Sequence, residues 1–476
     1  MSKLTPQSQD FPKWYQDVVQ MADLAEHSQV KGCMVIKPYG YAIWENIQKD
    51  LDARIKAAGV QNAYFPLFIP QSFLTREANH VEGFAPECAT VTHGGGKELA
   101  EPLVVRPTSE TIIYDTYSRW VQSYRDLPLL INQWANVVRW EMRTRPFLRT
   151  TEFLWQEGHT AHASKEEAET EVKRALDMYV DMDRELLALP VLTGKKSEKE
   201  TFAGADYTCT TEALARDGKA IQAGTSHLLG QTFAKAFDIK FQDEKGEVQH
   251  VWQTSWGVST RMVGTIIVCH GDEKGLRLPP RVAPIQVVLV PIFKTDEDKI
   301  RITQELGDLV QTLEAHGVRV KFDERDNLSP GWKFNEWEIK GVPIRIEMGP
   351  RDLEKSEVVV ARRDTSEKNS MPMADLASAI PDLLEEIQAN MLKQAEEFLN
   401  SSIHEADSVE EMKKILDEKG GFVKAAWAGS SDDEKIIQDK TKATIRIISD
   451  EPLSKKGTCI LTGKETDQLV YFAKAY

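Results

Sequence analysis

The chain has 476 residues, of which 41% are hydrophobic and 28% are charged. This length predicts two or three domains, because domains usually contain about 100 to 200 residues. The sequence lacks an apolar run of about 18 residues, the length that a membrane span requires, so we expect no membrane partner. The net charge of −15 disfavours non-specific binding to nucleic acid, because affinity for phosphates comes largely from Lys and Arg.

The five cysteines are widely scattered. An odd and sparse set argues against a disulfide framework and predicts free thiols. The first ten residues are polar and lack the basic and then apolar pattern of a signal peptide. We therefore expect a cytoplasmic protein.

The first part of the chain alternates predicted helices and strands. Apolar residues at helical spacing predict amphipathic helices over residues 11–30, 41–58 and 164–189. Strands are predicted over residues 31–39 and 63–69, and a β-like segment leads into a helix between Pro102 and Ile113. The glycines at 94–96 lack the spacing of a phosphate-binding loop and predict a hairpin tip.

Residues 132–162 predict a β-hairpin, because two runs rich in Val, Trp, Phe and Thr flank a polar turn that contains Pro146. Side chains alternate along a strand, so we expect Arg139 and Glu141 to point the same way. Trp155 and Glu157 share a face of the return strand for the same reason. A solvated sheet face with a few ion pairs is the plainer explanation for a single Arg-x-Glu pattern.

The second half of the chain predicts two further units. Strands at residues 285–290, 318–322, 342–348 and 357–361 alternate with helical segments at 296–315, 330–340 and 374–398. This rhythm is typical of a mixed α/β domain. From about residue 400 the chain is polar, with an acidic helix at 405–419 and short strands at 422–427 and 444–448.

Three segments resemble, in order, the three signature motifs of class II aminoacyl-tRNA synthetases. Residues 41–66 are similar to the first motif, Arg139-Trp140-Glu141 with Arg149 resembles the second, and 255–264 (SWGVSTRMVG) resembles the third. The segments RPTSET at 106–111 and QAGTSH at 222–227 narrow the resemblance to prolyl-tRNA synthetases of the archaeal and eukaryotic type. The interval between the second and third motifs leaves no room for the large editing insertion of the bacterial type.

The resemblance implies three domains. Residues 1–282 are expected to form an α+β catalytic domain with a mostly antiparallel sheet flanked by helices. Residues 283–399 are expected to form an α/β anticodon-binding domain with a mixed sheet, and residues 400–476 a small α/β C-terminal domain. The implied reaction joins proline and ATP to prolyl-adenylate, and then transfers the prolyl group to tRNA(Pro). The implied partners are L-proline, ATP with Mg²⁺, tRNA(Pro) and a second copy of the chain in a homodimer.

Site residues follow from the same resemblance. The residues expected to contact ATP are Arg139, Glu141, Gln222, Thr225, Ser259 and Arg261. Arg139 and Arg261 are expected to be catalytic. Gln222 is expected to contact the Mg²⁺ that binds with ATP. Proline is expected to contact Thr108, Glu110, Arg139, Trp155, Glu157, Phe202 and His227. One hydroxyl and one carboxylate suit a secondary ammonium, which has two protons and one positive charge. Helix capping and the helix dipole also explain Thr108 and Glu110, and a packed interior position also explains Phe202 and His227.

The resemblance also places functions outside the catalytic domain. The anticodon is expected to contact Glu338, Arg345, Arg351 and Asp352, whose charged groups match base edges, although solvated ion pairs explain them equally well. Relatives often hold zinc in the C-terminal domain with four cysteines. At the corresponding positions this chain has Ala428, Asp433 and a lone Cys459, so we expect no structural zinc.

Two other functions stay open. One is a class II synthetase for another small amino acid, such as threonine or glycine, and the matches at Thr108, Glu110 and His227 argue against it. The other is an inactive paralogue that binds RNA. Such a paralogue would be marked by the loss of a motif arginine, whereas Arg139 and Arg261 are both present.

Overall fold

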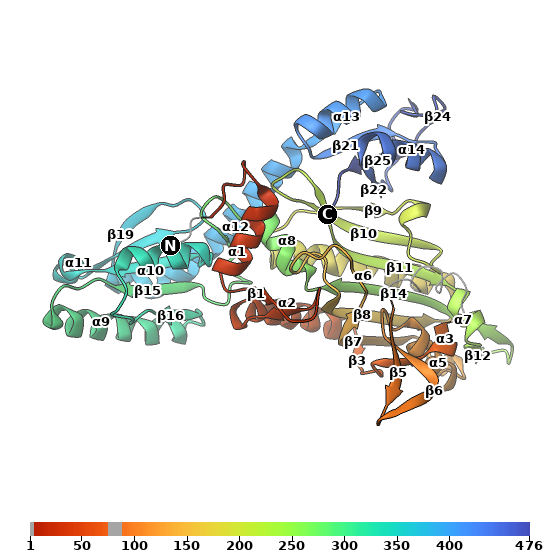
Figure 1. Ribbon diagram of the computed structural model, residues 1–476, viewed down its shortest axis with the longest axis horizontal. Helices are drawn as coiled ribbons and strands as arrows, with labels where there is room; N and C mark the ends of the chain where they lie inside the picture. The colour runs from red at the N-terminus through yellow and green to blue at the C-terminus, as the bar shows by residue number, and fades with distance from the viewer. Residues whose placement is uncertain (1–3, 75–87) are drawn as a thin grey trace.

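The computed structural model describes residues 4–74 and 88–476 (Figure 1). A central unit contains the elements from α1 to α8, a second unit contains those from β15 to α12, and the C-terminal unit contains those from β20 to β25. Figure 1 shows the second unit at one side of the central unit and the C-terminal unit above its sheet. None of the helices in residues 4–74 and 88–476 has the length and apolar character that a membrane crossing requires.

An 11-stranded sheet runs through the central and C-terminal units in the order β20-β21-β25-β22-β9-β10-β11-β14-β8-β7-β3. Its pairs are antiparallel, except β3 with β7 and β20 with β21. The mostly antiparallel catalytic sheet expected from the sequence is confirmed. The strands of the central unit are β3 (Gln61–Asn62), β7 (Leu129–Val138), β8 (Glu152–His162), β9 (Leu192–Lys195), β10 (Tyr207–Leu214), β11 (Ala220–Gly230) and β14 (Trp252–Ser259).

The predicted hairpin is formed by β7 and β8, with Val138 opposite Glu152. One part of the prediction is wrong, because β7 ends at Val138 and Arg139 and Glu141 lie beyond the strand. The backbone N–H of Arg139 still donates to the carbonyl of Thr151 over 2.8 Å. Arg139 is therefore held at the mouth of the hairpin, while Glu141 lies in the connecting loop.

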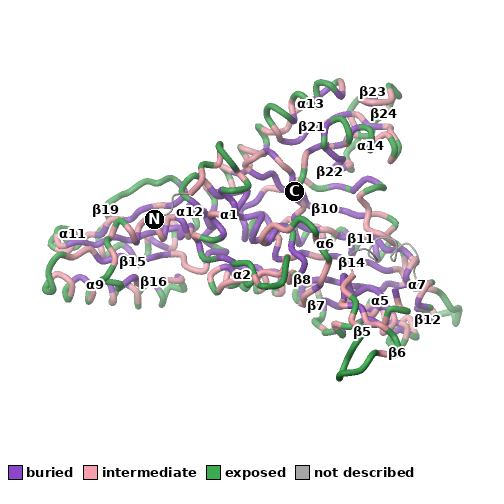
Figure 2. Tube along the Cα trace, viewed as in Figure 1, coloured by how far each residue is buried: buried purple, intermediate pink, exposed green. Residues whose placement is uncertain are grey.

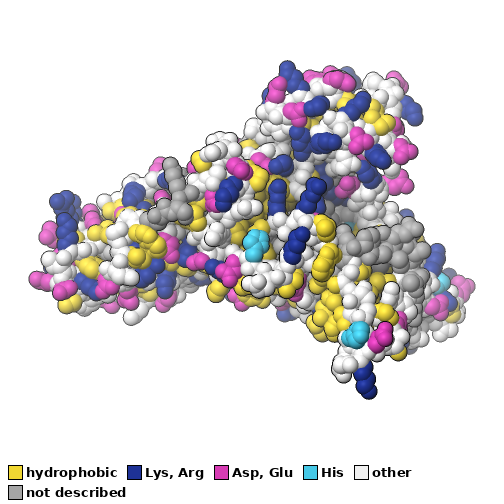
Figure 3. All heavy atoms as spheres, in the orientation of Figure 1, with side chains coloured by type: hydrophobic (Ala, Val, Ile, Leu, Met, Phe, Trp, Pro, Cys, Tyr) yellow, Lys and Arg dark blue, Asp and Glu magenta, His cyan; other side chains and the backbone are white. Residues whose placement is uncertain are grey.

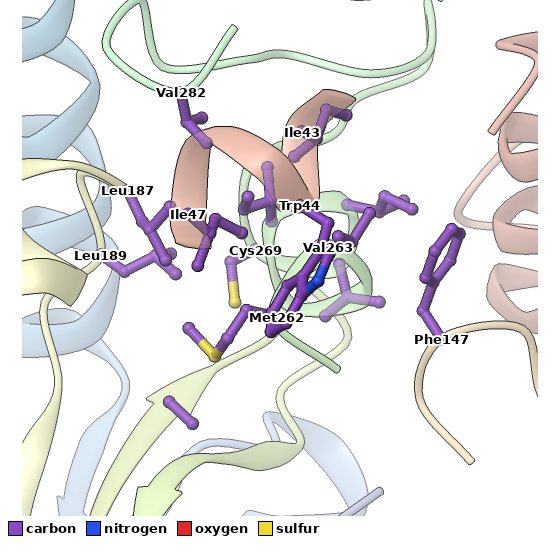
Figure 4. Close-up of a cluster of buried hydrophobic side chains, with 14 of the residues drawn as sticks. Ile43, Trp44, Ile47, Phe147, Leu187, Leu189, Met262, Val263, Cys269 and Val282 are labelled. Carbon is purple, nitrogen blue, oxygen red and sulfur yellow. The ribbon is translucent and has the colours of Figure 1, made fainter. Parts of the chain in front are cut away.

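Helices α2 (Pro38–Ala57), α6 (Lys165–Glu185) and α8 (Arg261–His270) form the main core with the sheet. Ser164 caps α6, since its side chain accepts from the N–H of Glu167. Figure 4 shows Trp44 of α2 beside Met262 and Val263 of α8, with Leu187 from the segment after α6 on the other side. This packing fixes the N-terminus of α8 at the end of β14.

A second core contains Phe65, Tyr114, Tyr117 and Phe233. It lies under α5 (Glu110–Trp120) and α7 (Thr232–Ala236). The adjoining three-stranded sheet consists of β4 (Phe68–Pro70), β5 (Ala89–Gly94) and β6 (Lys97–Val105), and Gly94 pairs with Lys97 as the predicted hairpin tip. Figure 2 shows this tip exposed.

The N-terminal prediction needs correction. The helix expected over residues 11–30 is α1 (Phe11–Met21), and it is followed by β1 (Ala25–His27) paired with β2 (Met34–Ile36). Asp23 has φ of 59° and Gly32 has φ of 83°. Helical φ values are negative, so the chain leaves the helix here, although the spacing of apolar residues predicts a helix as far as residue 30. The strand expected at 63–69 is likewise interrupted, because β3 ends at Asn62 and β4 begins at Phe68.

The second unit has a five-stranded mixed sheet in the order β16-β15-β17-β18-β19, which confirms the predicted class. Strands β16, β15 and β17 are parallel, and β18 and β19 are antiparallel additions. Its strands are β15 (Val287–Pro291), β16 (Val320–Phe322), β17 (Ile344–Met348), β18 (Glu357–Arg362) and β19 (Lys368–Pro372). Its helices are α9 (Asp296–Ala315), α10 (Pro330–Ile339), α11 (Pro350–Lys355) and α12 (Leu376–Ser401).

The C-terminal unit extends the central sheet, which the sequence did not predict. Its strand β22 (Thr444–Ile448) meets β9 where Ile448 pairs with Lys195. Its own core contains Trp427, Ile445, Val470 and Phe472. The remaining elements are β20 (Ile403–Glu405), β21 (Phe422–Ala426), β23 (Gly457–Thr458), β24 (Glu465–Thr466) and β25 (Leu469–Ala473), with α13 (Val409–Glu418) and α14 (Ser431–Thr441).

Candidate active site

A cavity of about 210 Å³ lies on the face of the large sheet formed by β8, β10, β11 and β14. It collects side chains that are far apart in the sequence. The predicted residues among its lining are Thr108, Glu110, Arg139, Trp155, Glu157, Phe202, Gln222, Thr225, His227, Ser259 and Arg261. The structure therefore brings together every predicted residue of the central unit except Glu141.

Glu141 lines a neighbouring cavity of about 200 Å³, together with Arg149. The two cavities share Arg139, Ser259 and Arg261 in their linings, so they adjoin each other at these side chains. Arg149 also donates from Nη2 to the backbone oxygen of Tyr476 over 3.2 Å. Tyr476 thus lies beside the loop between β7 and β8.

Two arginines, Arg139 and Arg261, line both cavities. Arg139 donates from Nε to the carbonyl of Pro107 over 2.8 Å, and its guanidinium lies 5.4 Å from the ring centre of Trp155. Arg261, the first residue of α8, donates to the carbonyl of Leu148 over 3.3 Å. Burial lowers the pKa of Arg261 to about 10, and the positive charges of Arg149 and Arg139 add to this effect. All the same, Arg261 stays charged at neutral pH and presents a fixed cation.

Thr108 and Glu110 form the opposite end of the large cavity. Both are buried, and the hydroxyl of Thr108 donates to the carboxylate of Glu110. The N-cap of α5 is Ser109, so capping does not account for Thr108. A buried carboxylate requires a cation or hydrogen-bond donors to offset its lost hydration. This end of the cavity is suited to an ammonium group.

Glu157 sits in a fully buried hydrogen-bond network. It accepts from Ser109 Oγ over 2.5 Å and from Gln133 Nε2 over 2.8 Å, and it lies 2.9 Å from Nε2 of His159. Burial acts to raise the pKa of Glu157, but the bond to His159 and the other donors lower it below its ordinary value. Burial likewise opposes the charge on His159, yet Glu157 raises the pKa of the imidazole.

Sequence reasoning missed His159, which lines the large cavity. The signal was present, because His159 is two residues after Glu157 on β8 and must share its face. Its other ring nitrogen lies 3.1 Å from the hydroxyl of Tyr114 on α5. His159 therefore ties the sheet to the helix that begins at Glu110.

Phe202 and His227 form a less polar wall. Their rings are 4.8 Å apart, and Nδ1 of His227 lies 2.8 Å from the hydroxyl of Thr208. Burial lowers the pKa of His227 to about 3, with smaller contributions from His159 and Arg139. His227 is thus neutral at pH 7, and this wall is suited to a small apolar ring rather than to a charge.

Gln222 and Thr225 lie on β11, and Ser259 ends β14 next to Arg261. The amide oxygen of Gln222 and the hydroxyl of Thr225 are hard oxygen donors of the kind that Mg²⁺ accepts beside phosphate oxygens and water. These residues therefore fit Mg²⁺ carried by a nucleotide. In residues 4–74 and 88–476, the structure has no group of three or more His, Cys, Asp or Glu side chains that could hold a metal by themselves.

The predicted anticodon residues fall in two places. Glu338 and Arg345 line a small cavity of the second unit, with Trp337 and Lys368. Arg345 pairs with Glu347 over 2.9 Å and lies 4.3 Å from the ring centre of Phe334. Arg351 and Asp352 lie instead in α11.

Asp352 caps a helix, because its carboxylate accepts from the N–H of Gly349 over 2.8 Å at the start of α11.

The C-terminal unit has a similar helix cap. Asp433, which the sequence analysis compared with the zinc-binding cysteines of the family, accepts from the N–H of Ser430 over 2.8 Å and caps α14. Cys459 is buried in the core of the C-terminal unit. The expected lack of zinc stays a prediction.

Models of three protein families match the chain. The tRNA synthetase class II core domain (G, H, P, S and T) matches residues 91–270, the anticodon binding domain matches 286–383, and the prolyl-tRNA synthetase C-terminal domain matches 409–476. These matches fall in the three units of the fold.

Two relatives and one solved structure cover nearly the whole chain. The proline–tRNA ligase of Chlorobaculum tepidum is 55% identical, over 100% of this chain and 99% of the relative. That of Flavobacterium johnsoniae is 54% identical over 100% of both. The crystal structure of prolyl-tRNA synthetase from Cryptosporidium parvum complexed with halofuginone and AMPPNP has a TM-score of 0.95 and 43% identity, and the match covers 99% of each chain. Assignment to the archaeal and eukaryotic type stays a prediction.

Proposed function

The chain belongs to the proline–tRNA ligase family, and from this premise we propose that it activates L-proline with ATP and transfers the prolyl group to the 3′ end of tRNA(Pro). One observation carries the proposal. Two adjoining cavities share the fixed arginines Arg139 and Arg261, and the larger cavity also has the buried carboxylate of Glu110 and the hydroxyl of Thr108. Such a site holds a small amino acid with its carboxylate directed toward a nucleotide.

In this proposal the proline ammonium binds Thr108 and Glu110, which offer one hydroxyl and one carboxylate. The ring lies against Trp155, Phe202 and the neutral His227. The network around Glu157 keeps these walls in place, because rigid and fully paired polar groups fix the shape of a pocket. Arg139 neutralises the carboxylate of proline and reaches the α-phosphate.

The nucleotide occupies the part of the site between Glu141 and Arg261. Glu141 accepts from the adenine amino group, Ser259 and Thr225 line the phosphate path, and Arg261 binds the γ-phosphate end. Mg²⁺, when bound near Gln222, supplies further neutralisation of phosphate charge. The carboxylate oxygen of proline forms the new bond to the α-phosphorus as the bond to pyrophosphate breaks.

Charge develops on the α-phosphate during this displacement, so catalysis depends on alignment and on fixed cations rather than on a covalent nucleophile. Arg139 lines both cavities, and in this proposal it contacts both reacting groups. In the second step a ribose hydroxyl of tRNA attacks the prolyl carbonyl, and AMP leaves. We assign Arg139 and Arg261 as the catalytic residues.

We propose that the second unit binds the anticodon through Glu338 and Arg345, with Arg351 and Asp352 as further contacts on α11. A negative chain that binds RNA requires local basic surface. Figure 3 shows Lys and Arg side chains gathered near the middle of one face, next to the C-terminal unit.

We propose the cytoplasm as the compartment, since all five cysteines are free thiols.

A homodimer is proposed from exposed aromatic side chains beside the first motif. Tyr64 is 70% exposed, Phe68 is 45% exposed and Trp120 is 48% exposed. Figure 3 shows hydrophobic side chains gathered near β7 and the β5–β6 hairpin. Exposed apolar patches mark contact surfaces, and a second copy is the occupant that we propose. Analytical ultracentrifugation should give twice the chain mass, and Trp120→Glu should give the monomer mass.

The decisive test of the activity is ATP–pyrophosphate exchange measured with each of the twenty amino acids. Proline alone should stimulate exchange strongly, and tRNA(Pro) should then be charged. Exchange driven by threonine or glycine would replace proline with another substrate. A folded protein without exchange for any amino acid would make the chain an inactive relative.

A further inference from the structure

A buried ionic cluster joins the C-terminal unit to the central unit. Glu212 of β10 is fully buried and accepts from Lys196 Nζ over 2.7 Å. Arg446 of β22 binds the same carboxylate at two points, from Nε over 3.1 Å and from Nη2 over 3.0 Å. Thr210 donates to it over 3.1 Å. Both carboxylate oxygens are thus engaged by protein groups, and Glu212 is no candidate metal ligand.

The cluster lies at the nucleotide end of the candidate active site. Glu212 is the register partner of Gln222 across β10 and β11, at a β-bulge between Thr211 and Glu212. Residues paired across antiparallel strands share a face, so Glu212 lies on the face that carries Gln222. Arg446 also lies 3.9 Å from Glu200, which lines the large cavity.

The charged groups of the cluster affect the pKa of Arg261. Burial is the main cause of the lowered pKa of Arg261, followed by Arg149 and Arg139, but Glu212 raises this pKa and Arg446 lowers it. The positive charges of Lys196 and Arg446 are balanced by Glu212 and by Glu200, which pairs with Arg446 over 3.9 Å. The cluster therefore adds no net charge to the nucleotide region, and it acts there through the geometry that it fixes.

Docking alone does not require these ions. The seam already has the pairing of Ile448 with Lys195 and an apolar contact group of Leu214, Ala220, Phe422 and Ala473. Buried ion pairs are weak contributors to stability, because desolvation offsets most of their attraction. Hydrogen bonds to both carboxylate oxygens do hold Glu212 in one arrangement, and Glu212 is the cross-strand neighbour of Gln222.

We propose that Arg446 is a positioning residue of the nucleotide site, acting through Glu212 to hold the β10–β11 segment that carries Gln222. The C-terminal unit would then support the adenylation site through this ion pair, without Arg446 itself contacting a substrate. This inference rests on the proposed nucleotide site at Gln222 and Arg261.

The test is proline-dependent ATP–pyrophosphate exchange on the full chain, with separate KM values for ATP and proline. Arg446→Gln should raise the KM for ATP about tenfold, the effect of losing one charge-assisted hydrogen bond, and the KM for proline less than about twofold. Arg446→Lys, which keeps the charge but loses the two-point contact, should give an intermediate KM for ATP. Ile437→Val is the matched control, because it loosens the core of the C-terminal unit without touching the cluster.

Several outcomes would overturn the inference. One is an unchanged KM for ATP in folded Arg446→Gln, and another is an equal rise in Ile437→Val, which would reduce the cluster to a docking contact. If Arg446→Gln fails to fold, a KM for ATP at the wild-type value in Arg446→Lys overturns it as well. Failure of the proposed function is a separate result, because the wild-type chain would then show no exchange with proline.

Discussion

Asp183 of α6 is a fully buried carboxyl group, and it should make the protein less stable as the pH rises. Its Oδ2 accepts from Thr211 over 3.2 Å, and its Oδ1 has no hydrogen-bond partner among the residues that the structure describes. Burial raises its pKa from 3.8 to about 8. Because the folded pKa is raised, the contribution to stability is fully present below pH 3.8 and is lost as the pH rises toward 8.

The magnitude follows from the interval between the unfolded and folded pKa values. Each pH unit in that interval changes the free energy of unfolding by about 1.4 kcal/mol. Asp183→Asn keeps the shape and the acceptor for Thr211 but cannot ionise. It should therefore stabilise the protein by about 2 kcal/mol at pH 5 and about 4 kcal/mol at pH 7.

Urea unfolding followed by tryptophan fluorescence at each pH measures this difference. Asp181→Asn is the matched control, because Asp181 is exposed on the same helix, and its effect should stay within about 0.5 kcal/mol. An Asp183→Asn effect that is equal at pH 5 and pH 7 would show that Asp183 ionises normally in the folded protein. A destabilising effect at pH 7 would refute the argument from burial.

Three further outcomes are expected. Arg139→Ala should lower exchange by a factor of about 10² to 10³ at an unchanged thermal midpoint, since it removes a fixed charge from the transition state, and near-normal exchange would exclude Arg139 from the mechanism. Arg345→Ala should weaken aminoacylation of tRNA and spare exchange, because it lies in the second unit; a parallel fall in both would contradict the anticodon assignment. Metal analysis should find no stoichiometric zinc, and zinc that survives dialysis but disappears in Cys459→Ser would contradict this expectation.

Local patterns in the sequence predicted the elements that depend on neighbouring residues. The helix expected at 296–315 is α9 with the same bounds, because Thr295 caps it by accepting from the N–H of Asp298. The hairpin of β7 and β8 and the tip at Gly94 followed from alternation and turn chemistry. The motif residues were also readable in order, since each is part of a short segment.

The tertiary structure decided what depends on distant residues. It ended β7 at Val138 and placed Arg139 beyond the strand, where the carbonyls of Thr151 and Pro107 hold it. It decided that Asp352 caps a helix, and it set His159 in a network with Tyr114 from another element.

The seam between the central and C-terminal units shows the physical reason most clearly. Arg446 and Glu212 are 234 positions apart, and neither has a local signal that names the other. A buried charge must find its counter-charge, but periodicity reports only that a position is buried. The pairing of β22 with β9 brings Arg446 to Glu212, and this pairing forms only when the chain folds.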